Sequence, residues 1–594
     1  MLGNEAIARG AYEAGVKVAS GYPGTPSTEI LEEIANYEEI YTEWSVNEKV
    51  AMDVAIGASL GGVRSIVTMK HAGVDVASDP FIPISFMGVN GGLVLVSSDD
   101  IGAVSSPTEQ DTRIYAKLFH VPMLEPSDSQ EAKDFTVLAY ILSERFDVPF
   151  FLRTTNGVSH SKGIVRFSQR KEKVFPPFDR LSPKFRPQGG IHPIVLHQNG
   201  FERLKRIENY AEKAKINRIE WGDRKIGIIS SGITYQYAKE VLPFASFLKL
   251  GITYPLPPEL IKLFASKIKE LYIIEEMEPF LEEQIRAMGI KAKGSELRPH
   301  AGALSREKLI EIFSGTLKRF GQKVEKPKPP FAQVIKRFPT MCPGCLHLAM
   351  YYAIRMLRRK MKDKDIVVMG DIGCYSLGIA APHNILGCAF AMGSGISSAH
   401  GLNMALKEGS DKIVLSYIGD STFLHAGIPS LLNAIYNKSN ITVIIADNRT
   451  TAMTGGQEHA GTGKTIQGEM RIPVDLKELC RSLGVTDLQE VDPYDYKSAY
   501  EALSRAIEFD GVSVLIANRP CVLFPKKLRE TPFQILPEEC TGCGVCLTIY
   551  CPSIIVSDKK TEKGKYQAAI DPYSCVGCSF CAQICPSQAI VQMS

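Results

Sequence analysis

The sequence predicts a protein of several α/β domains that ends in a small cysteine-rich domain. Three observations carry this prediction. Apolar helical stretches alternate with short β-branched runs in three regions, which is typical of doubly wound parallel sheets. Polar, Pro-rich stretches separate these regions. Finally, eight of the 14 cysteines lie in two short runs between residues 540 and 585.

The size and composition are those of a globular protein. The chain has 594 residues, of which 45% are hydrophobic and 22% charged, and its formal net charge is +3. This length can hold about three or four domains. The near-neutral net charge does not indicate binding to nucleic acid or to an anionic membrane. No apolar run of the sequence is long enough to cross a bilayer. Because the start, MLGNEAIARGAYEAG, lacks the pattern of a signal peptide, we expect a cytoplasmic protein.

The first half of the chain is expected to form two α/β domains. Residues 1–167 contain VRSIVTM and GGLVLVSSDD, which predict buried strands between helices. The polar, basic and Pro-rich stretch 168–223 is predicted as a linker or surface excursion. The alternation returns in a smaller domain, 224–320, through KIGIISSG, LKLGITYPL and ELYIIEEM.

The second half begins with another linker. KVEKPKPPF, within residues 321–333, has the charged, Pro-rich composition of a semi-rigid connector. The third α/β domain, 334–527, has expected strands in DIVVMGDIG, KIVLSYIGD, ITVIIADN and VSVLIANRP. Residues 528–594 are the cysteine-rich domain.

Each cysteine run has three cysteines spaced by two residues and a fourth that precedes proline. Three such thiolates can wrap one [4Fe–4S] cube, while the Pro-flanked cysteine reaches the other cube. The first ligand set is then Cys540, Cys543, Cys546 and Cys585, and the second is Cys575, Cys578, Cys581 and Cys551. Exposed clusters of this kind favour a reducing, anaerobic cytoplasm.

The two runs resemble a bacterial two-cluster ferredoxin with one departure. Four residues precede Cys551 in the first run, where the ferredoxin pattern has three. The alternatives are zinc sites and disulfides, but zinc usually takes two CxxC pairs about a dozen or more residues apart. The pattern therefore favours iron–sulfur clusters and electron transfer.

The third α/β domain carries a pattern suited to a diphosphate. The strand KIVLSYIGD ends at Gly419, Asp420 and Ser421, and the next strand ends at Asp447 and Asn448. Open α/β sheets bind ligands at these carboxyl ends, and carboxylate and amide oxygens suit Mg²⁺ that also holds phosphates. The alternative is an ordinary strand–turn pair, because GD and DN are common turn dipeptides.

This pattern resembles the thiamine diphosphate motif, GDG followed by NN. The resemblance implies that Asp420, Asn448 and the main-chain carbonyl of Thr450 bind the metal. The GSGISS segment at 393–398 has two of the three glycines of a dinucleotide fingerprint and is interpreted as a close-packed helix start. Its Gly393 is included among the candidate cofactor-binding residues.

Thiamine enzymes also need a glutamate that bonds to a ring nitrogen of the aminopyrimidine, so that the ring can remove the thiazolium proton. In the first domain, Glu48 opens an apolar helix of small residues within YTEWSVNEKVAMDVAIGASLGG. The alternative is a solvated first-turn glutamate stabilised by the helix dipole. Glu43 is the competing candidate for the role.

Several segments together resemble one family. GYPGTPSTEI, EWSVNEKVAMDVAIGAS, TMKHAGVDV, MCPGCLH, GDIGCYSLG, the GDS…DN pair and the double cysteine run occur in this order. The chain resembles the alpha subunits of indolepyruvate:ferredoxin oxidoreductases over essentially its whole length, least at 168–222. The resemblance implies a pyrimidine-binding domain, a transketolase C-terminal-like domain, a diphosphate-binding domain and a two-cluster ferredoxin-like domain.

The resemblance also implies roles for residues. Glu48 is then the activating glutamate, and Thr25 of YPGTP lies by the substrate carboxylate. His71 and His425 would face the thiazolium, with buried, hydrogen-bonded core histidines as the alternative.

The remaining cysteines suggest a third cluster. Related pyruvate and 2-oxoglutarate oxidoreductases hold a cluster beside the thiamine with a CxxC pair and two later cysteines. Cys342, Cys345, Cys374 and Cys521 match that arrangement, with reduced structural thiols as the alternative. Cys388 and Cys480 are interpreted as small buried hydrophobes.

The family implies the oxidative decarboxylation of aryl pyruvates such as indolepyruvate and phenylpyruvate. Coenzyme A takes the acyl group, and the clusters pass electrons singly to ferredoxin. A smaller beta subunit is expected, in an α2β2 assembly. The alternatives are another 2-oxoacid as substrate, such as a branched-chain acid, a non-oxidative thiamine decarboxylase or carboligase, and an electron-carrier subunit with an inactive thiamine fold.

Overall fold

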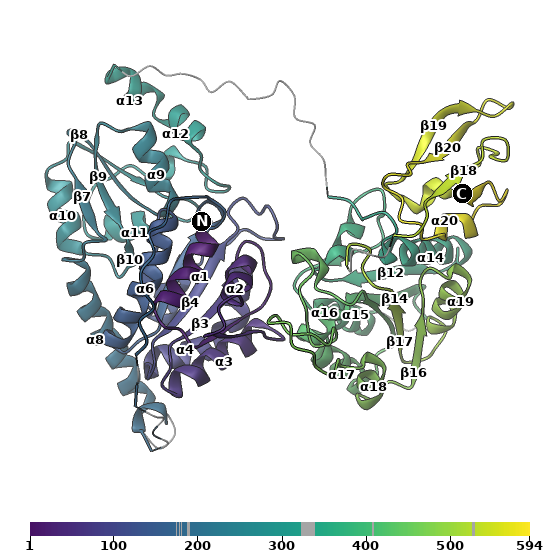
Figure 1. Cartoon of the computed structure of the whole chain (residues 1–594), viewed down its shortest axis with the longest axis horizontal. Coiled ribbons are helices and arrows are strands. Elements are labelled where there is room, and N and C mark those ends of the chain that lie inside the picture. The colour runs from purple at the N-terminus through teal and green to yellow at the C-terminus, as the bar shows by residue number, and fades with distance from the viewer. Residues whose placement is uncertain are drawn as a thin grey trace. The chain divides into compact units, whose positions relative to one another are not determined.

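A computed structural model describes residues 1–173, 175–176, 179, 181–186, 191–321, 339–406, 409–524 and 529–593. The chain forms two compact units, residues 1–333 and 334–594 (Figure 1). Most of the expected linker 321–333 and the expected boundary at 527/528 lie outside the described residues, and the five boundaries between the expected segments stay predictions.

The first unit is built on a seven-stranded sheet with strand order β10-β5-β6-β4-β3-β1-β2. Its strands are β1 Val18–Gly21, β2 Tyr41–Trp44, β3 Ser65–Lys70, β4 Leu93–Asp99, β5 Met123–Leu124, β6 Phe150–Thr155 and β10 Ile252–Tyr254. All neighbours are parallel except β10 and β5. Every residue of β4 and β6 is buried, as expected of strands covered by helices on both faces.

Helices cover this sheet. They are α1 Gly3–Glu13, α2 Thr28–Ile34, α3 Glu48–Leu60, α4 His71–Met87, α5 Arg113–Phe119, α6 Ser129–Phe146 and α7 Asn156–Ser159. Small residues of α3 pack with α4 over the sheet, because Ala51, Ala55 and Phe81 share one core with Val67 and Leu95.

The stretch 168–223, expected as a linker or excursion, contains the short turn η1 Pro183–Phe185 and the 19-residue helix α8 Pro193–Ala211. Proline at the first helical position and buried Leu196, Leu204 and Ile207 on one face explain α8. Arg203 of α8 donates to the carbonyl of Phe86 in α4 at 2.6 Å. This helix therefore packs on the first domain.

A second, four-stranded sheet has the order β11-β8-β9-β7. Its elements are β7 Arg218–Glu220, β8 Asp223–Ser231, α9 Gly232–Val241, β9 Ala245–Leu250, α10 Pro258–Ser266, β11 Glu270–Ile274, α11 Phe280–Ala287, η2 Ser295–Leu297, α12 Arg306–Ile312 and α13 Ser314–Arg319. The segment after β9 contributes β10 to the first sheet, and Arg113 of α5 forms a buried 2.7 Å ion pair with Glu275. These contacts join both domains into one unit.

The second unit contains an all-parallel sheet of order β13-β12-β14-β15-β17-β16. Its strands are β12 Asp365–Gly370, β13 Cys388–Ala389, β14 Lys412–Gly419, β15 Ile441–Asp447, β16 Asp487–Val491 and β17 Val512–Asn518. The helical segments are α14 Leu346–Lys360, η3 Cys374–Ile379, α15 Ser394–Ala405, α16 Asp420–Thr422, η4 Phe423–Gly427, α17 Ile428–Tyr436, η5 Ala452–Thr454, α18 Leu476–Ser482 and α19 Tyr496–Ala506.

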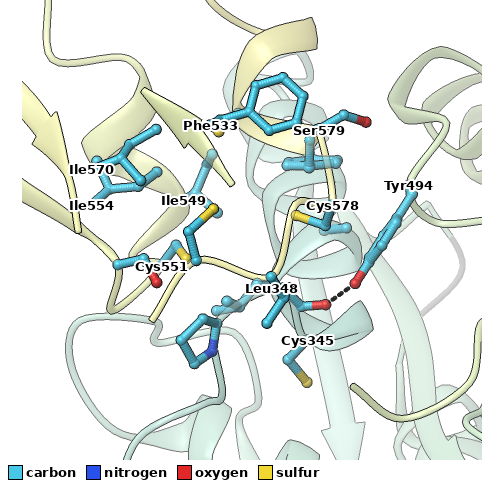
Figure 2. Close-up of a pocket in the computed structure, with 18 residues that line it drawn as sticks. Cys345, Leu348, Tyr494, Phe533, Ile549, Cys551, Ile554, Ile570, Cys578 and Ser579 are labelled. Carbon is cyan, nitrogen blue, oxygen red and sulfur yellow. Dashed lines mark hydrogen bonds between the residues drawn. The ribbon is translucent and has the colours of Figure 1, made fainter. Parts of the chain in front are cut away.

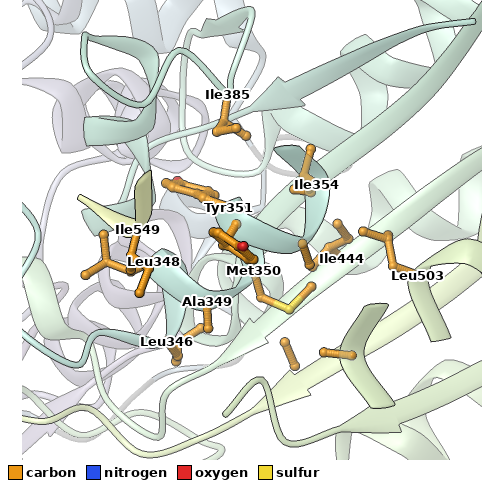
Figure 3. Packing of buried hydrophobic residues seen from close by; sticks show 14 of the residues in the cluster. Leu346, Leu348, Ala349, Met350, Tyr351, Ile354, Ile385, Ile444, Leu503 and Ile549 are labelled. Carbon is orange, nitrogen blue, oxygen red and sulfur yellow. The ribbon is translucent and has the colours of Figure 1, made fainter. Parts of the chain in front are cut away.

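The cysteine-rich end packs on this domain. It consists of two antiparallel pairs, β18 Phe533–Ile535 with β21 Ile590–Gln592 and β19 Ile554–Lys560 with β20 Tyr566–Ile570, together with η6 Cys546–Ile549 and α20 Phe580–Gln583. Leu348 and Tyr351 of α14 share one hydrophobic core with Ile549 and Phe580 (Figure 3). In the described residues, no helix is long and apolar enough to span a membrane.

Candidate active site

Three neighbouring strands of the second unit each end at a buried aspartate. Asp371 follows β12, Asp420 follows β14 and Asp447 ends β15. Since β14 lies between β12 and β15 in parallel register, these carboxylates converge at one edge of the sheet. All three side chains are less than 5% exposed. The edge is therefore where an open α/β sheet binds its ligand.

The electrostatics of this edge fit a cation. Asp420 Oδ1 accepts from the Ser421 N–H at 2.9 Å, while its buried Oδ2 makes no hydrogen bond with the described residues and lies 3.2 Å from His459 Nε2. Burial raises the pKa of Asp447, and the neighbouring Asp420 raises it further. The Arg449 guanidinium lies 3.1 Å from Asp447, and two buried carboxylates in contact are further stabilised by a shared proton or by a bound cation.

The proposed Mg²⁺ ligands lie together. Asn448 is 9% exposed, and its side-chain oxygen accepts from the Thr450 N–H at 3.1 Å. The Thr450 hydroxyl donates to the Gln457 carbonyl, so this turn is held by its own hydrogen bonds. Asp420, Asn448 and Thr450 supply hard oxygen ligands of the kind Mg²⁺ prefers.

Gly393 precedes α15 on the same side of the fold. Its φ is 80°, and an added Cβ would lie 2.5 Å from the Cβ of Ala426, so only glycine fits. Ala426 belongs to η4, a π-helical turn that also carries the buried His425. Turns of this type are frequent at functional sites.

Sequence reasoning missed Asp371 and His459. Burial raises the pKa of Asp371 to about 7, its Oδ1 accepts from the Tyr375 hydroxyl, and its carboxylate faces the main-chain N–H groups of Gly393 and Gly395. The signal for Asp371 was present, because GDIGC follows a predicted strand as GDS does. His459 lies in an irregular loop and had no such signal.

In the first unit, Glu48 is the first residue of α3 and is only 6% exposed. It is therefore not a solvated first-turn glutamate. Its Cγ and Oε1 lie within 2.9 Å of where a Cβ on Gly73 would stand, so Glu48 packs against the first turn of α4. Glu43, the competing candidate, is half-buried in β2 and accepts hydrogen bonds from Tyr41 and Ser45.

The other first-unit candidates also surround this turn. His71 is the first residue of α4 and is fully buried. Its Nδ1 accepts from the Asp100 N–H at 3.3 Å, and burial lowers its pKa. The Thr25 carbonyl accepts from the Ser105 hydroxyl at 3.4 Å, while Lys70, just before α4, donates to the Ser105 carbonyl. Thr25, Glu48 and His71 therefore gather at one end of α4.

The structure brings the two predicted cluster sets together. The pKa of Cys546 is raised to about 11 by burial and further by Cys543, Cys585 and Cys540. The pKa of Cys578 is raised to about 11 by burial and further by Cys551 and Cys575. Cys581 neighbours Cys578, Cys551 and Cys575.

Within the described residues, no three Cys, His, Asp or Glu side chains meet as ligands of one metal ion. A [4Fe–4S] cube differs, because each thiolate binds a different iron and the four sulfurs stand apart. Bound iron would reverse the raised pKa values, since coordination holds the thiols deprotonated. Both sets of four thiols fit such clusters.

Comparison with known proteins decides the family. The chain is 39% identical to indolepyruvate oxidoreductase subunit IorA of Archaeoglobus fulgidus, over 99% of this chain and 97% of that protein. The IorA subunit of Methanothermobacter marburgensis is 37% identical, over 99% of this chain and 96% of that protein. The chain belongs to the IorA family.

Family models match the chain domain by domain. Residues 9–218 match the pyruvate flavodoxin/ferredoxin oxidoreductase, thiamine diP-binding model, 371–517 the C-terminal TPP-binding domain of thiamine pyrophosphate enzymes, and 527–589 a 4Fe-4S dicluster domain. The predicted fold class and the cofactors thiamine diphosphate and [4Fe–4S] are thereby confirmed. The chain is a subunit of a thiamine-dependent 2-oxoacid:ferredoxin oxidoreductase. A more distant relative, 2-oxoglutarate synthase subunit KorA of Methanocaldococcus jannaschii, is 25% identical over 45% of this chain and 86% of its own length.

Four of the six remaining cysteines also converge. The pKa of Cys374 is raised to about 11 by burial and further by Cys521 and Cys342. Burial raises the pKa of Cys345, and Cys374, Cys342 and Cys521 raise it further. The Cys521 N–H donates to the Asn448 carbonyl at 2.9 Å. These four thiols therefore lie next to Asn448, at the carboxyl end of β15. Cys480, interpreted as a small hydrophobe, is fully buried, and Cys388 is half-buried.

One ligand set lines a pocket between the two domains of the second unit. Cys551, Cys575, Cys578 and Cys581 line it from the cysteine-rich domain, and Gly344, Cys345, Leu348 and Tyr494 line it from the α/β domain. Figure 2 shows Cys551, Cys578 and Tyr494 around this pocket. The Tyr494 hydroxyl, buried beside Cys578, donates to the Gly344 carbonyl. We propose this pocket as the site of the second cluster.

The extra residue of the first run has a structural role. Tyr550, just before Cys551, has φ of 60° and absorbs the longer spacing in a left-handed turn. Its ring meets His383 edge-on at 5.7 Å, and the Arg355 guanidinium lies 4.8 Å from the ring centre. Arg355 also donates to the Thr548 carbonyl. Tyr550 thus holds the ferredoxin-like domain on the diphosphate-binding domain.

Proposed function

We propose that this chain oxidatively decarboxylates aryl pyruvates, such as indolepyruvate and phenylpyruvate, with coenzyme A. The products are the aryl-acetyl-CoA, carbon dioxide, one proton and two electrons, and the electrons pass singly through the clusters to ferredoxin. The observation that carries the proposal is the name of its relatives, indolepyruvate oxidoreductase, at 37–39% identity over nearly the whole chain. The cysteines of the second unit supply the electron route that this reaction needs.

Thiamine diphosphate, when bound, supplies an electron sink for the electrons of the carbon–carboxylate bond. Asp420, Asn448 and the Thr450 carbonyl would hold Mg²⁺ against its diphosphate, with Gly419, Ser421 and Gly393 approaching the phosphates through the main chain. The raised pKa of Asp447 beside Asp420 supports this assignment, because a cation there offsets two buried carboxylates.

Residues of the first unit would handle the proton and the substrate. Glu48, buried, would bond to the aminopyrimidine ring and hold the proton there. Thr25 would bind the substrate carboxylate. Burial lowers the pKa of His71, which favours the neutral imidazole, so His71 would face the thiazolium as a hydrogen-bond partner. His425, also buried, is proposed to face the thiazolium as well.

Cys342, Cys345, Cys374 and Cys521 would hold a third cluster. Their convergence next to Asn448 supports it. This cluster would take electrons first, since Cys345 also lines the pocket of the second cluster. Single-electron steps between neighbouring clusters suit a one-electron carrier.

The relatives are named as subunits, so we propose a smaller beta subunit as partner in an α2β2 assembly. The test is anaerobic ferredoxin reduction by purified alpha and beta subunits, with coenzyme A and a panel of 2-oxoacids. The highest kcat/KM is expected for indolepyruvate and phenylpyruvate. Faster turnover of a branched-chain acid or of 2-oxoglutarate would show that this acid, and not an aryl pyruvate, is the substrate. Aldehyde release without ferredoxin reduction would show that the reaction is a non-oxidative decarboxylation.

A further inference from the structure

The two cluster sites of the ferredoxin-like domain are not equivalent. All four cysteines of the second set, Cys575, Cys578, Cys581 and Cys551, are buried or half-buried, and they line the pocket against α14 and Tyr494. A Cβ on Gly344 would stand 3.4 Å from the Cβ of Cys578, so the CPGC turn touches this site. The second set is therefore the inner site, which receives electrons from the α/β domain.

The first set faces outward. Cys543 is exposed, whereas Cys546 is buried and Cys540 is half-buried. The loop that carries them packs on the β19–β20 hairpin, because Gln567 of β20 donates to the carbonyls of Cys540 and Pro537 at 3.0 and 2.6 Å. This site is the place where electrons can leave the protein.

The hairpin beside Cys543 is positively charged. Residues 558–565 read DKKTEKGK, with four lysines against Asp558 and Glu562, and all six side chains are exposed. Within the described residues none of these lysines forms an ion pair, and Lys560 lies over the Tyr566 ring at 4.5 Å. Exposed Ile555, Val556 and Tyr566 add apolar surface to the same hairpin.

The position of the hairpin suits a partner protein. Figure 1 shows that β19 and β20 project from the rest of the second unit. Lys565 touches the cluster loop, since a Cβ on Gly542 would stand 2.9 Å from the Lys565 Cβ. The start of this loop is negatively charged instead, because the exposed Glu538 and Glu539 precede Cys540. The positive surface is therefore the hairpin itself, and it would orient a docking carrier.

We infer that the lysine-rich β19–β20 hairpin is the docking surface for an acidic one-electron carrier protein, which takes electrons from the cluster of Cys540, Cys543, Cys546 and Cys585. The inference rests on the proposed electron transfer to ferredoxin and adds where on the protein the carrier docks. Each turnover releases two electrons, so two carriers are reduced by one electron each, and no bond is made or broken in the transfer. Complementary charge speeds encounter and selects acidic partners.

The test reverses charge on the hairpin with the Lys559→Glu/Lys563→Glu variant, which leaves Lys565 at the cluster loop intact. The matched control is Lys362→Glu/Lys364→Glu, two exposed lysines after α14. Enzyme whose clusters have been reduced with dithionite, and then freed of it, is mixed anaerobically with an acidic [4Fe–4S] ferredoxin. At low ionic strength the hairpin variant should reduce it at least about tenfold more slowly, and salt should narrow the difference.

Two further measurements make the result specific. Propylviologen sulfonate, a zwitterion without net charge, should be reduced at the same rate by the hairpin variant and the wild type, and basic cytochrome c should be reduced faster by the variant than by the wild type. Equal ferredoxin rates for wild type and hairpin variant, or an equal loss in the control variant, would overturn the inference. Because the clusters are reduced chemically, failure of 2-oxoacid oxidation would count against the proposed function alone.

Discussion

At the scale of single residues, buried charge is the feature that marks the site. Asp371, Asp420 and Asp447 lie at neighbouring strand ends with little solvent, and Glu48 is buried at the start of a helix. A fold keeps such groups only where a partner compensates for lost hydration. We propose that groups of the bound cofactor complete this compensation, beside protein partners such as His459 at Asp420 and Arg449 at Asp447.

Glu48→Gln should abolish 2-oxoacid-dependent methyl viologen reduction, by about 10²-fold or more, because the amide cannot hold the transferred proton. The iron content and visible spectrum should stay unchanged. Glu43→Gln is the matched control and should retain activity. Turnover by the Glu48 variant at the wild-type rate would assign the role to another residue.

Cys374→Ser should lower the iron content from about twelve to about eight atoms per chain, because one cube would be lost. Cys388→Ser, which changes a half-buried thiol outside the three sets, serves for comparison. Anaerobic iron analysis and low-temperature EPR of the reduced proteins give the readout. An iron content equal to that of the wild type would contradict the proposal of a third cluster at Cys374.

At the scale of elements, the sequence predicted what is periodic and local. The strands 412–419 and 441–447 coincide with mostly apolar runs of the sequence. For this reason β14 and β15 were predictable, together with Asp420 and Asn448, which follow them. The helix α8 was not predicted, because its buried Leu196, Leu204 and Ile207 are spaced among polar residues after a Pro-rich stretch. His459 was missed because it lies in an irregular loop and its partner, Asp420, comes from a distant segment, whereas Asp371 was overlooked although it follows a predicted strand. The roles of Thr25, Glu48, His71 and His425 stay predictions.

Tyr550→Asn should weaken the attachment of the ferredoxin-like domain by about 1 kcal/mol. Asparagine tolerates the left-handed backbone, so the loss reports on the ring contacts with Arg355 and His383. Anaerobic urea unfolding measures it, and Tyr573→Asn, at a ring 90% exposed, is the control. Equal midpoints for the Tyr550 variant and wild type would contradict this role.

At the scale of the whole molecule, the two units have separate cores and different dependence on iron. The cysteine sites all lie in the second unit, and Cys546 and Cys581 belong to the core that also contains α14. The first unit is held by its own apolar core and by buried pairs such as Arg113 with Glu275.

Removal of iron should therefore lower the melting temperature of one transition and leave the other in place. Cluster binding stabilises the folded state through its thiolates, and apo protein loses this contribution in the second unit alone. Anaerobic calorimetry before and after chelation gives the comparison. A parallel shift of both transitions would show that the units unfold together.

The pairing of β10 with β5 has a consequence for dissecting the protein. A chain shortened to residues 1–223 would lack Ile252–Tyr254. The strand β5, with its buried Met123 and Leu124, would then become an exposed, unpaired edge strand. Unpaired amide and carbonyl groups beside apolar side chains invite self-association. The pyrimidine-binding domain is thus completed by a later stretch of sequence, and fragments intended for crystallisation or NMR should keep both α/β layers of the first unit.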